Sequence, residues 1–212
     1  MRDTSSIRQA PIGDPIARTL ILFAGWFFIA VWLGVSGKLN QHGAPPLGFA
    51  AALLLPLAAF VADRRWGSRL FGGLVRLDLQ ALIVPQTFRI VGVVFVVAWM
   101  TGTLPAGFAL PAGLGDIAVG LASPFVAAAV AQRRPGHLRL AWIWNVLGTL
   151  DLVTAVALGV LHGRSPIGLL AGPVPTDAMT RYPLSLIPTF LVPIALMLHL
   201  ATFRRLRHAA ER

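Results

Sequence analysis

The chain has 212 residues, of which 56% are hydrophobic and only 12% charged, about half the charged share of an ordinary soluble domain. Its formal net charge is +10, but the arginines stand in short clusters between long apolar runs, which is not the pattern of a nucleic-acid-binding surface. It contains no cysteine, which excludes disulfides, iron–sulfur ligation and thiol catalysis.

Six apolar segments are long enough, or nearly long enough, to cross the ~30 Å of a bilayer core as helices. The sequence therefore predicts an all-α, polytopic membrane protein with a single six-helix transmembrane domain over residues 17–203. A tail, 1–16, precedes this domain and a basic tail, 204–212, follows it. The first segment has one alternative, a cleaved signal peptide that ends near Val35-Ser36-Gly37. The six segments cover residues 17–36, 46–62, 81–101, 112–131, 139–161 and 183–203.

Basic residues are divided unevenly between the two sides of this arrangement. The side with both tails and the second and fourth connections holds 14 arginines, whereas the other side holds Lys38, Arg164 and Arg181. The positive-inside rule then places both termini in the cytoplasm, in agreement with an even number of spans. Because 17 of the 18 basic residues are arginine, as GC-rich bacterial genomes favour, we expect the inner membrane of a bacterium.

Three connections have features of their own. Residues 69–80 place their leucines on one helical face, which predicts an amphipathic helix on the inner leaflet or an extension of the third span, with a kink at Pro85. The segment 104–113 repeats Leu-Pro-Ala-Gly, and the segment 162–182 is rich in proline and glycine. Both are expected to fold on the outer side as a lip or a shallow re-entrant turn.

Apart from Arg18 and Arg139 at the very ends of spans, only three charged residues lie within the spans: Arg89, Asp116 and Asp151. A guanidinium keeps its proton, so Arg89 needs an anion, water or carbonyl partners inside hydrocarbon. Helix rise puts Arg89 and Asp151 within ~6 Å of each other in depth, so we expect them to pair, and it puts Asp116 about 6 Å below the outer surface. The pair is either a functional site or a structural clamp, and Asp116 has the alternative role of an anion at a helix N-terminus.

Other polar residues of the spans are assigned more ordinary roles. Gln86, which shares a helical face with Arg89, and Asn145 are expected to form hydrogen bonds between helices. Asp116, Gly120, Ser123 and Ala127 form a stripe of small or polar residues suited to close helix approach or to a cavity wall. His199, one turn from the arginine cluster at 204, is interpreted as an interfacial histidine rather than a ligand.

Metal and cofactor chemistry is not predicted. The other four histidines lie in loops or the tail, so there is neither a pair of histidines for haem nor a zinc-binding spacing. A glycine-rich phosphate loop and a hydrolase motif are likewise missing from the sequence. We therefore expect no cofactor, and the sequence favours a protein without catalytic activity while leaving a membrane enzyme open as an alternative.

Two short motifs resemble a family. Val84-Pro85-Gln86-Thr87-Phe88-Arg89, followed by Leu110-Pro111-Ala112-Gly113-Leu114-Gly115-Asp116, is similar to a set of small, uncharacterised bacterial membrane proteins with six spans. The resemblance extends over most of the chain. It implies a topology and no activity, so it assigns no functional residue.

The leading functional hypothesis is a small carrier whose substrate or proton pathway passes Arg89, Asp151 and Asp116 in the bilayer. Its solute would be a small anion bound by Arg89, or a proton carried by the aspartates. A weak similarity links two motifs in the third and sixth segments, Pro85-Gln86-Thr87-Phe88 and Pro188-Thr189-Phe190. Such a similarity is what the inverted repeats of transporters would produce. The alternatives are a scaffold subunit that binds a second copy or another membrane protein, and a lipid-processing enzyme in which an aspartate is the base.

Overall fold

The structure, a computed structural model, describes residues 14–40, 46–65 and 70–210. These residues form helices and no β-strand, which confirms the predicted all-helical class. Among them, five helical segments are long and apolar enough to cross a membrane, and α2 (Leu47–Arg65) adds a shorter apolar stretch, Leu47–Asp63. The five are Pro15–Val35, Leu79–Met100, Ala106–Ala131, His137–Leu161 and Ile187–Ala209.

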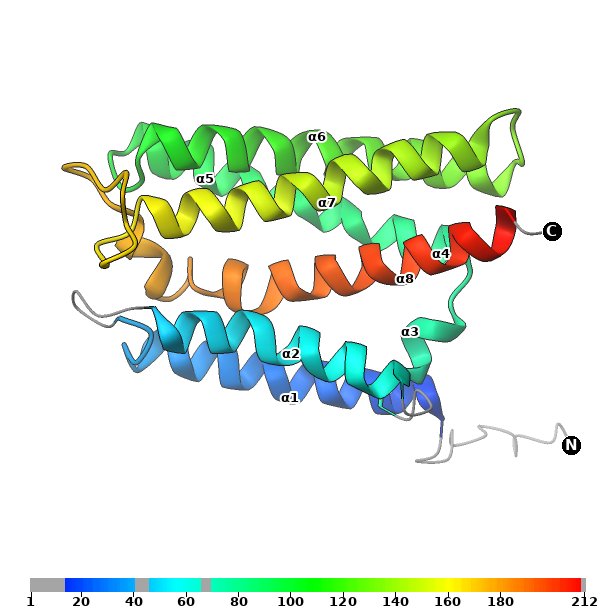
Figure 1. Cartoon of the computed structure of the whole chain (residues 1–212), viewed down its shortest axis with the longest axis horizontal. Coiled ribbons are helices and arrows are strands. Elements are labelled where there is room, and N and C mark those ends of the chain that lie inside the picture. The colour runs from blue at the N-terminus through cyan, green and yellow to red at the C-terminus, as the bar shows by residue number, and fades with distance from the viewer. Residues whose placement is uncertain (1–13, 41–45, 66–69, 211–212) are drawn as a thin grey trace, which may run out of the picture.

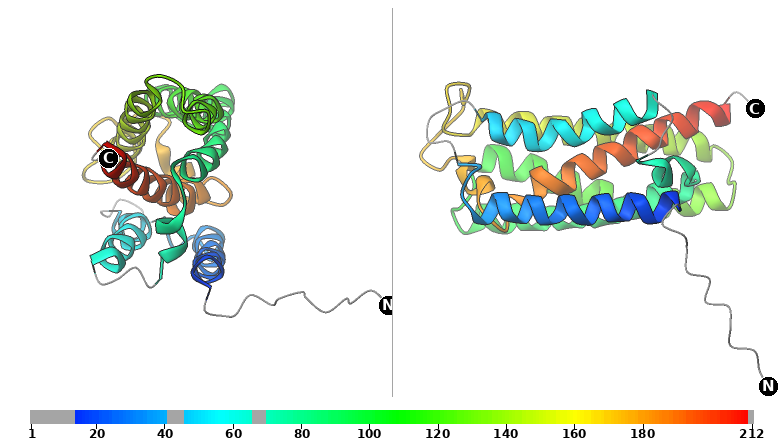
Figure 2. Two further views of the ribbon diagram at one scale, coloured as in Figure 1. Left: turned by 90° about the vertical axis from the view of Figure 1, so that its right-hand side faces the viewer. Right: turned by 90° about the horizontal axis from the view of Figure 1, so that it is seen from below.

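These elements run side by side along the long axis of the molecule (Figure 1). The segment Leu79–Met100, which is the third apolar segment of the sequence, is called the third segment below. In the end-on view it forms one group with α6 (Ala106–Ala131), α7 (His137–Leu161) and α8 (Val192–Ala210) (Figure 2). Helices α1 (Pro15–Val35) and α2 lie on the far side of α8 from α6 and α7. α8 is therefore the element that joins the two halves of the bundle.

The two ends of the bundle differ in what they carry. The start of α1, the α6–α7 turn and the end of α8 lie together at one end, which we call the terminal end (Figure 1). Residues 36–40, 101–105 and 162–186 lie at the opposite end, which we call the loop end. The basic residues Arg133, Arg134, Arg204 and Arg207 are thus all at the terminal end.

Residues 69–80 do not form the single amphipathic helix that their leucines predicted. Their described part contains the short helix α3 (Gly72–Arg76), extended backbone at Leu77 and the first residues of a second helix, α4 (Leu79–Ile83). The Asp78 carboxylate caps α4 by accepting a hydrogen bond from the Ala81 backbone N–H at 2.7 Å. This cap interrupts the leucine pattern, and residue 69 lies outside the described residues.

α4 leads directly into η1 (Val84–Gly92), a 3₁₀ helix of nine residues, and then into α5 (Val93–Met100). Pro85 contributes to this change because it lacks the N–H that would continue the α-helical hydrogen bonds. A 3₁₀ helix repeats every three residues, so side chains three apart lie in line. The buried residues follow this spacing: Ile83, Gln86, Arg89, Gly92 and Phe95. The kink expected at Pro85 thus takes the form of a change in helical pitch that turns Gln86 and Arg89 inward.

α6 begins at Ala106, and the lip expected over residues 104–113 is therefore wrong for most of that segment. Pro105 stands at the N-cap, and Pro111 is accommodated inside the helix, where a bundle tolerates it. The predicted close helix approach is confirmed. The Ser123 hydroxyl donates to the Ile83 carbonyl at 2.6 Å, and a Cβ at Gly120 would lie 2.8 Å from the Ile90 backbone nitrogen.

The last segment starts as η3 (Ile187–Leu191), a π-helical turn, and continues as α8 through residues that the sequence assigned to a tail. The helix extends because no proline or glycine interrupts residues 204–210. The Arg205 side chain also donates to the Leu77 carbonyl at 2.9 Å. Arg207 and His208 lie in its last turn, where the helix dipole favours cations.

Residues 162–186 cover the loop end, in agreement with the lip expected there. They include η2 (Thr176–Thr180), whose Thr176 hydroxyl donates to the Gly159 carbonyl of α7 at 2.6 Å. Met179 of the same turn is buried in the hydrophobic core. This segment thereby closes part of the bundle over α7.

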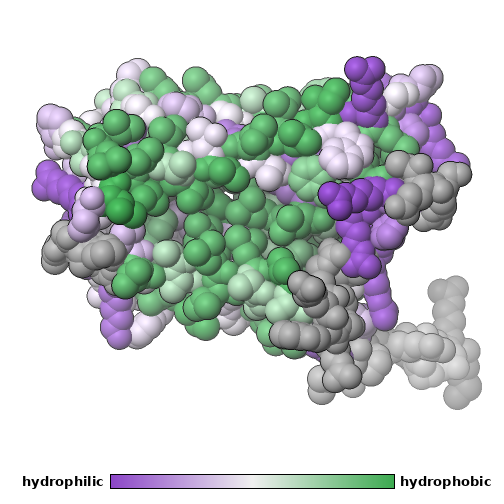
Figure 3. Space-filling view, in the orientation of Figure 1, coloured by the Kyte–Doolittle hydropathy of each residue, from purple (hydrophilic) through white to green (hydrophobic). Residues whose placement is uncertain are grey.

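The outer surface of the bundle is apolar along its middle. Large hydrophobic side chains are exposed on the helices, among them Phe28 of α1 and Leu55 of α2. Hydrophobic residues gather along the middle of the face in Figure 3, and hydrophilic residues gather toward both ends. Exposed apolar area on this scale is unfavourable in water and favourable in lipid. The surface therefore supports the membrane association that the five apolar helices indicate.

Candidate functional site

Arg89 lies at the centre of the bundle, with 1% of its surface exposed. Its Nε donates to Asp116 Oδ1 on α6 at 2.7 Å, and its Nη2 donates to Asp151 Oδ2 on α7. Its Nη1 donates to the Gly148 carbonyl on α7 at 3.0 Å. All three guanidinium nitrogens are thus bonded, as a buried, permanently charged group requires.

His199 of α8 completes the shell around Arg89. Its Nε2 lies 3.1 Å from Arg89 Nη1, which can only donate, so Nε2 is the acceptor and the imidazole proton is assigned to Nδ1. Nδ1 then donates to Asn145 Oδ1 at 2.7 Å, and the Asn145 amide donates back to the His199 carbonyl at 3.2 Å. The histidine is therefore neutral, and the charged members of the cluster are Arg89, Asp116 and Asp151.

Two glycines of the neighbouring helices make room for these side chains. A Cβ at Gly148 would lie 2.6 Å from His199 Cε1 and 3.1 Å from Arg89 Nη1. A Cβ at Gly115 would overlap the Asp151 carboxylate. The guanidinium and its partners thus lie directly against the backbones of α6 and α7.

The two aspartates reach Arg89 at the same level of the bundle. Asp116 lies ten residues after the start of α6, and Asp151 lies ten residues before the end of α7, so each is about 15 Å from the loop end of its helix. The shallow position expected for Asp116, and its alternative role at a helix N-terminus, are therefore wrong. The error comes from the start of α6, which is Ala106 and not residue 112.

The charged cluster carries one more negative than positive group. One guanidinium faces two carboxylates, which gives a formal charge of −1 when both acids are ionised. An uncompensated charge is costly in a low-dielectric interior, where one additional positive charge is favoured. The arrangement therefore suits the binding of a proton or of a monovalent cation.

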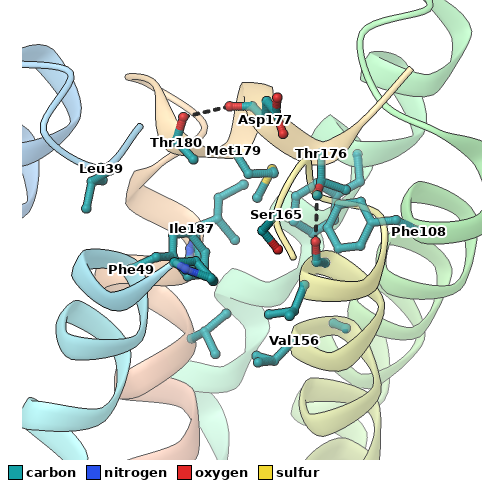
Figure 4. A pocket seen from close by; sticks show the side chains of 18 of the residues that line it. Leu39, Phe49, Phe108, Val156, Ser165, Thr176, Asp177, Met179, Thr180 and Ile187 are labelled. Carbon is teal, nitrogen blue, oxygen red and sulfur yellow. Dashed lines mark hydrogen bonds between the residues drawn. The ribbon is translucent and has the colours of Figure 1, made fainter. Parts of the chain in front are cut away.

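A cavity of about 380 Å³ extends from the loop end down to Asp116. Its walls come from α6, α7, η3, the start of α2 and the segment 162–186, and the labelled side chains converge from opposite sides (Figure 4). A further space of about 10 Å³, comparable to one water, is lined by both Arg89 and Asp116. Asp116 lines both spaces, so it stands between the cavity and the guanidinium.

The structure brings the predicted site residues into one region. Arg89 and Asp151 form the expected pair, and Asp116 joins it. Asn145 bonds between α7 and α8, and Gln86 Nε2 donates to the Ala195 carbonyl of α8 at 3.0 Å. Gln86 Oε1 is buried and accepts no hydrogen bond from the described residues. Whether these residues take part in a function stays a prediction.

His199 is a second residue that sequence reasoning placed wrongly. It is fully buried beside Arg89, with its ring centroid 5.3 Å from that of Trp144 and the two rings tilted by 46°, and is not at an interface. The continuation of α8 to Ala210 moves it away from the helix end. His199 lies four residues after Ala195, whose carbonyl accepts from Gln86. Residues four apart share a face of an α-helix, so this spacing is the signal that places His199 on the inward face of α8.

Fold and site together define a class of all-helical protein in which several candidate membrane spans surround one buried arginine–aspartate cluster. The chain belongs to the family described as Domain of unknown function (DUF8737), which matches residues 46–207. The match includes every member of the charged cluster and leaves α1 outside. No curated protein and no solved structure matches the chain.

Proposed function

We propose that the protein is a proton-coupled carrier of small solutes in the bacterial inner membrane. The observation that carries this proposal is the position of Asp116, which faces a cavity open at the loop end and at the same time holds Arg89. Intramembrane charges of this kind mark substrate or proton pathways in other membrane proteins. The excess acid of the cluster gives such a carrier its proton-binding group.

The proposed topology has six spans and both termini in the cytoplasm. Helix α2 is the sixth, shorter span, and the two ends of the bundle support an even number of crossings, because the start of α1 and the end of α8 lie together (Figure 1). The arginines at the terminal end favour the cytoplasm for that end. The cavity then opens toward the periplasm.

The regions around the two proline motifs support a carrier in a second way. Pro85 stands in the 3₁₀ helix η1 and Pro188 in the π-helical turn η3, so the third and sixth segments both depart from α-helical geometry. Discontinuous helices in corresponding positions of two halves are a feature of transporters with inverted repeats. Arg89 belongs to one of these regions and Pro188 lines the cavity from the other.

The observed bonds favour a proton or a cation over the small anion suggested by the sequence. All three nitrogens of Arg89 already bind protein acceptors, so an anion would have to displace a carboxylate, a carbonyl or His199. Such a displacement leaves a buried group without its partner, which is costly. The carboxylates, in contrast, outnumber the guanidinium.

Proteoliposomes with the dye pyranine trapped inside test the proposal. Gradients of three probes are imposed in turn: benzyltrimethylammonium as a cation, benzenesulfonate as an anion and mannitol as a neutral solute. We expect at least one gradient to change the internal pH, and we expect no such change in protein-free vesicles. A scaffold subunit or a lipid-processing enzyme would move protons with none of the three, and that result would overturn the carrier.

A further inference from the structure

We infer that the cavity binds a monovalent, amphipathic organic cation, which takes the place of a proton at Asp116. This inference rests on the proposed carrier function and names the class of its substrate. It is argued from three features of the cavity: its walls, its floor and the charges at its entrance.

The walls favour an apolar body of modest size. Aromatic and aliphatic side chains supply most of the lining, among them Phe49, Phe95, Phe108, Val156 and Ile187. The volume of about 380 Å³ is at the small end of the range for sites of organic ligands. Phe95 and Phe108 pack edge to face with ring centroids 5.3 Å apart, and aromatic rings attract organic cations.

The floor favours a positive charge. Arg89 holds only one oxygen of Asp116, Oδ1, and Asp116 belongs to the lining of the cavity whereas Asp151 does not. The groups that face Asp116 are Arg89 from η1 and, through Arg89, Asp151 from α7 and the neutral His199 from α8. A cation at the floor therefore meets the one formal negative charge that Arg89 leaves uncompensated.

The entrance adds no preference of its own. Arg164 and Asp177 both line it, and the Arg164 backbone N–H donates to Asp177 Oδ1 at 3.0 Å. Their formal charges cancel, so these two lining residues give the entrance no net charge. The choice between a cation and an anion is thus made at Asp116.

The exchange is balanced in charge. In the empty site a proton occupies the excess carboxylate, and the entering cation takes over its role while the proton leaves through the cavity. One positive charge enters and one leaves, so the cluster keeps the same net charge. The cation remains chemically unchanged.

Calorimetric titration of the purified protein in detergent with benzyltrimethylammonium tests this inference, with benzenesulfonate as the probe of opposite charge and a detergent-only titration as the blank. We expect the cation to bind and the sulfonate not to bind. Asp116→Asn should weaken binding of the cation about tenfold to a hundredfold, as the loss of a charged partner does. The matched control Asp78→Asn, an exposed N-cap where asparagine is an equally good cap, should leave binding unchanged.

A second pair of variants keeps the test valid if Asp116→Asn does not fold. Val156→Trp fills part of the cavity without replacing a member of the charged cluster, and Val153→Trp adds the same ring to the exposed face of the same helix. We expect the first to abolish binding of the cation and the second to preserve it. Equal binding in both, or binding of the sulfonate alone, would overturn the inference.

The result can be separated from the fate of the carrier. If a gradient of the sulfonate or of mannitol moves protons in proteoliposomes and the cation does not bind, the carrier function is supported and the organic-cation substrate is contradicted. If the cation binds as described and no probe moves protons, the cation-binding site is supported and the carrier function is contradicted.

Discussion

Arg89 Nε donates to Asp116 Oδ1 at 2.7 Å, and this bond joins the 3₁₀ helix of the third segment to the middle of α6. It places the guanidinium between two carboxylates, since Asp151 on α7 binds the other side. Three elements that are distant in sequence thus meet at one charged group. The stability of the bundle and its proposed function both depend on this meeting point.

Arg89→Gln should reduce the amount of folded protein strongly. The change leaves the buried Asp116 and the partly buried Asp151 without a counter-charge, and breaking a buried ion pair from one side costs about 3–5 kcal/mol. The double variant Arg89→Gln/Asp151→Asn removes one of the two unbalanced charges and should recover much of the lost abundance. Membrane abundance and thermal unfolding of the purified variants measure both effects.

The same double variant separates a structural clamp from a functional site. If it recovers abundance and also retains the proton movement of the wild type, the cluster has a structural role only. The proposal predicts recovered abundance without proton movement.

Gly120→Ala should destabilise the protein, because its Cβ would lie 2.8 Å from the Ile90 backbone nitrogen and the third segment would have to move away from α6. Overpacking of this kind costs about 1–3 kcal/mol. Gly25→Ala is the matched control, since a Cβ there meets nothing within 4 Å. Thermal unfolding in detergent should show a loss for the first variant and none for the second, and an equal response of the two would contradict the close packing.

Asn145→Leu should cost about 1–3 kcal/mol, because His199 Nδ1 loses the acceptor that fixes the orientation of the ring. Val146→Leu, at the next position of α7 and partly exposed, provides a control that introduces the same side chain. Denaturation midpoints of both variants measure the difference. A midpoint for Asn145→Leu equal to that of the wild type would show that the amide does not support the histidine.

The absence of cysteine in the sequence allows a direct test of the topology. Ala171→Cys introduces a thiol at the loop end, and Gln132→Cys introduces one in the α6–α7 turn; both positions are exposed. In intact bacteria a membrane-impermeant maleimide should label the first and should reach the second only after permeabilisation. Labelling in the reverse order would place the termini outside.

Hydropathy and charge were sufficient to predict the helical class and the pairing of Arg89 with Asp151. Long apolar runs and rare intramembrane charges can both be recognised in a sequence without knowledge of the tertiary structure. The start of α6 was not predictable in the same way. Proline and glycine in residues 104–113 suggested a turn, whereas packing against the third segment keeps residues 106–113 helical. The depth of Asp116 was wrong for that reason.

The 3₁₀ geometry of residues 84–92 could not be predicted from the sequence either. Gln86 and Arg89 share a face in either an α-helix or a 3₁₀ helix, so their spacing does not distinguish the two. The line continues to Gly92 and Phe95 only in the structure, where the glycines of α6 allow the backbones to approach. His199 was misplaced because the end of α8 could not be located from composition alone.

Proton movement by Asp116→Asn proteoliposomes, compared with the control Asp78→Asn, tests the central claim most directly. The pyranine assay is run with whichever probe the wild type transports. We expect Asp116→Asn to lower proton movement on the order of a hundredfold, as the loss of a group that carries the proton does, and Asp78→Asn to behave as the wild type. Proton movement in Asp116→Asn at the rate of the wild type would contradict the account.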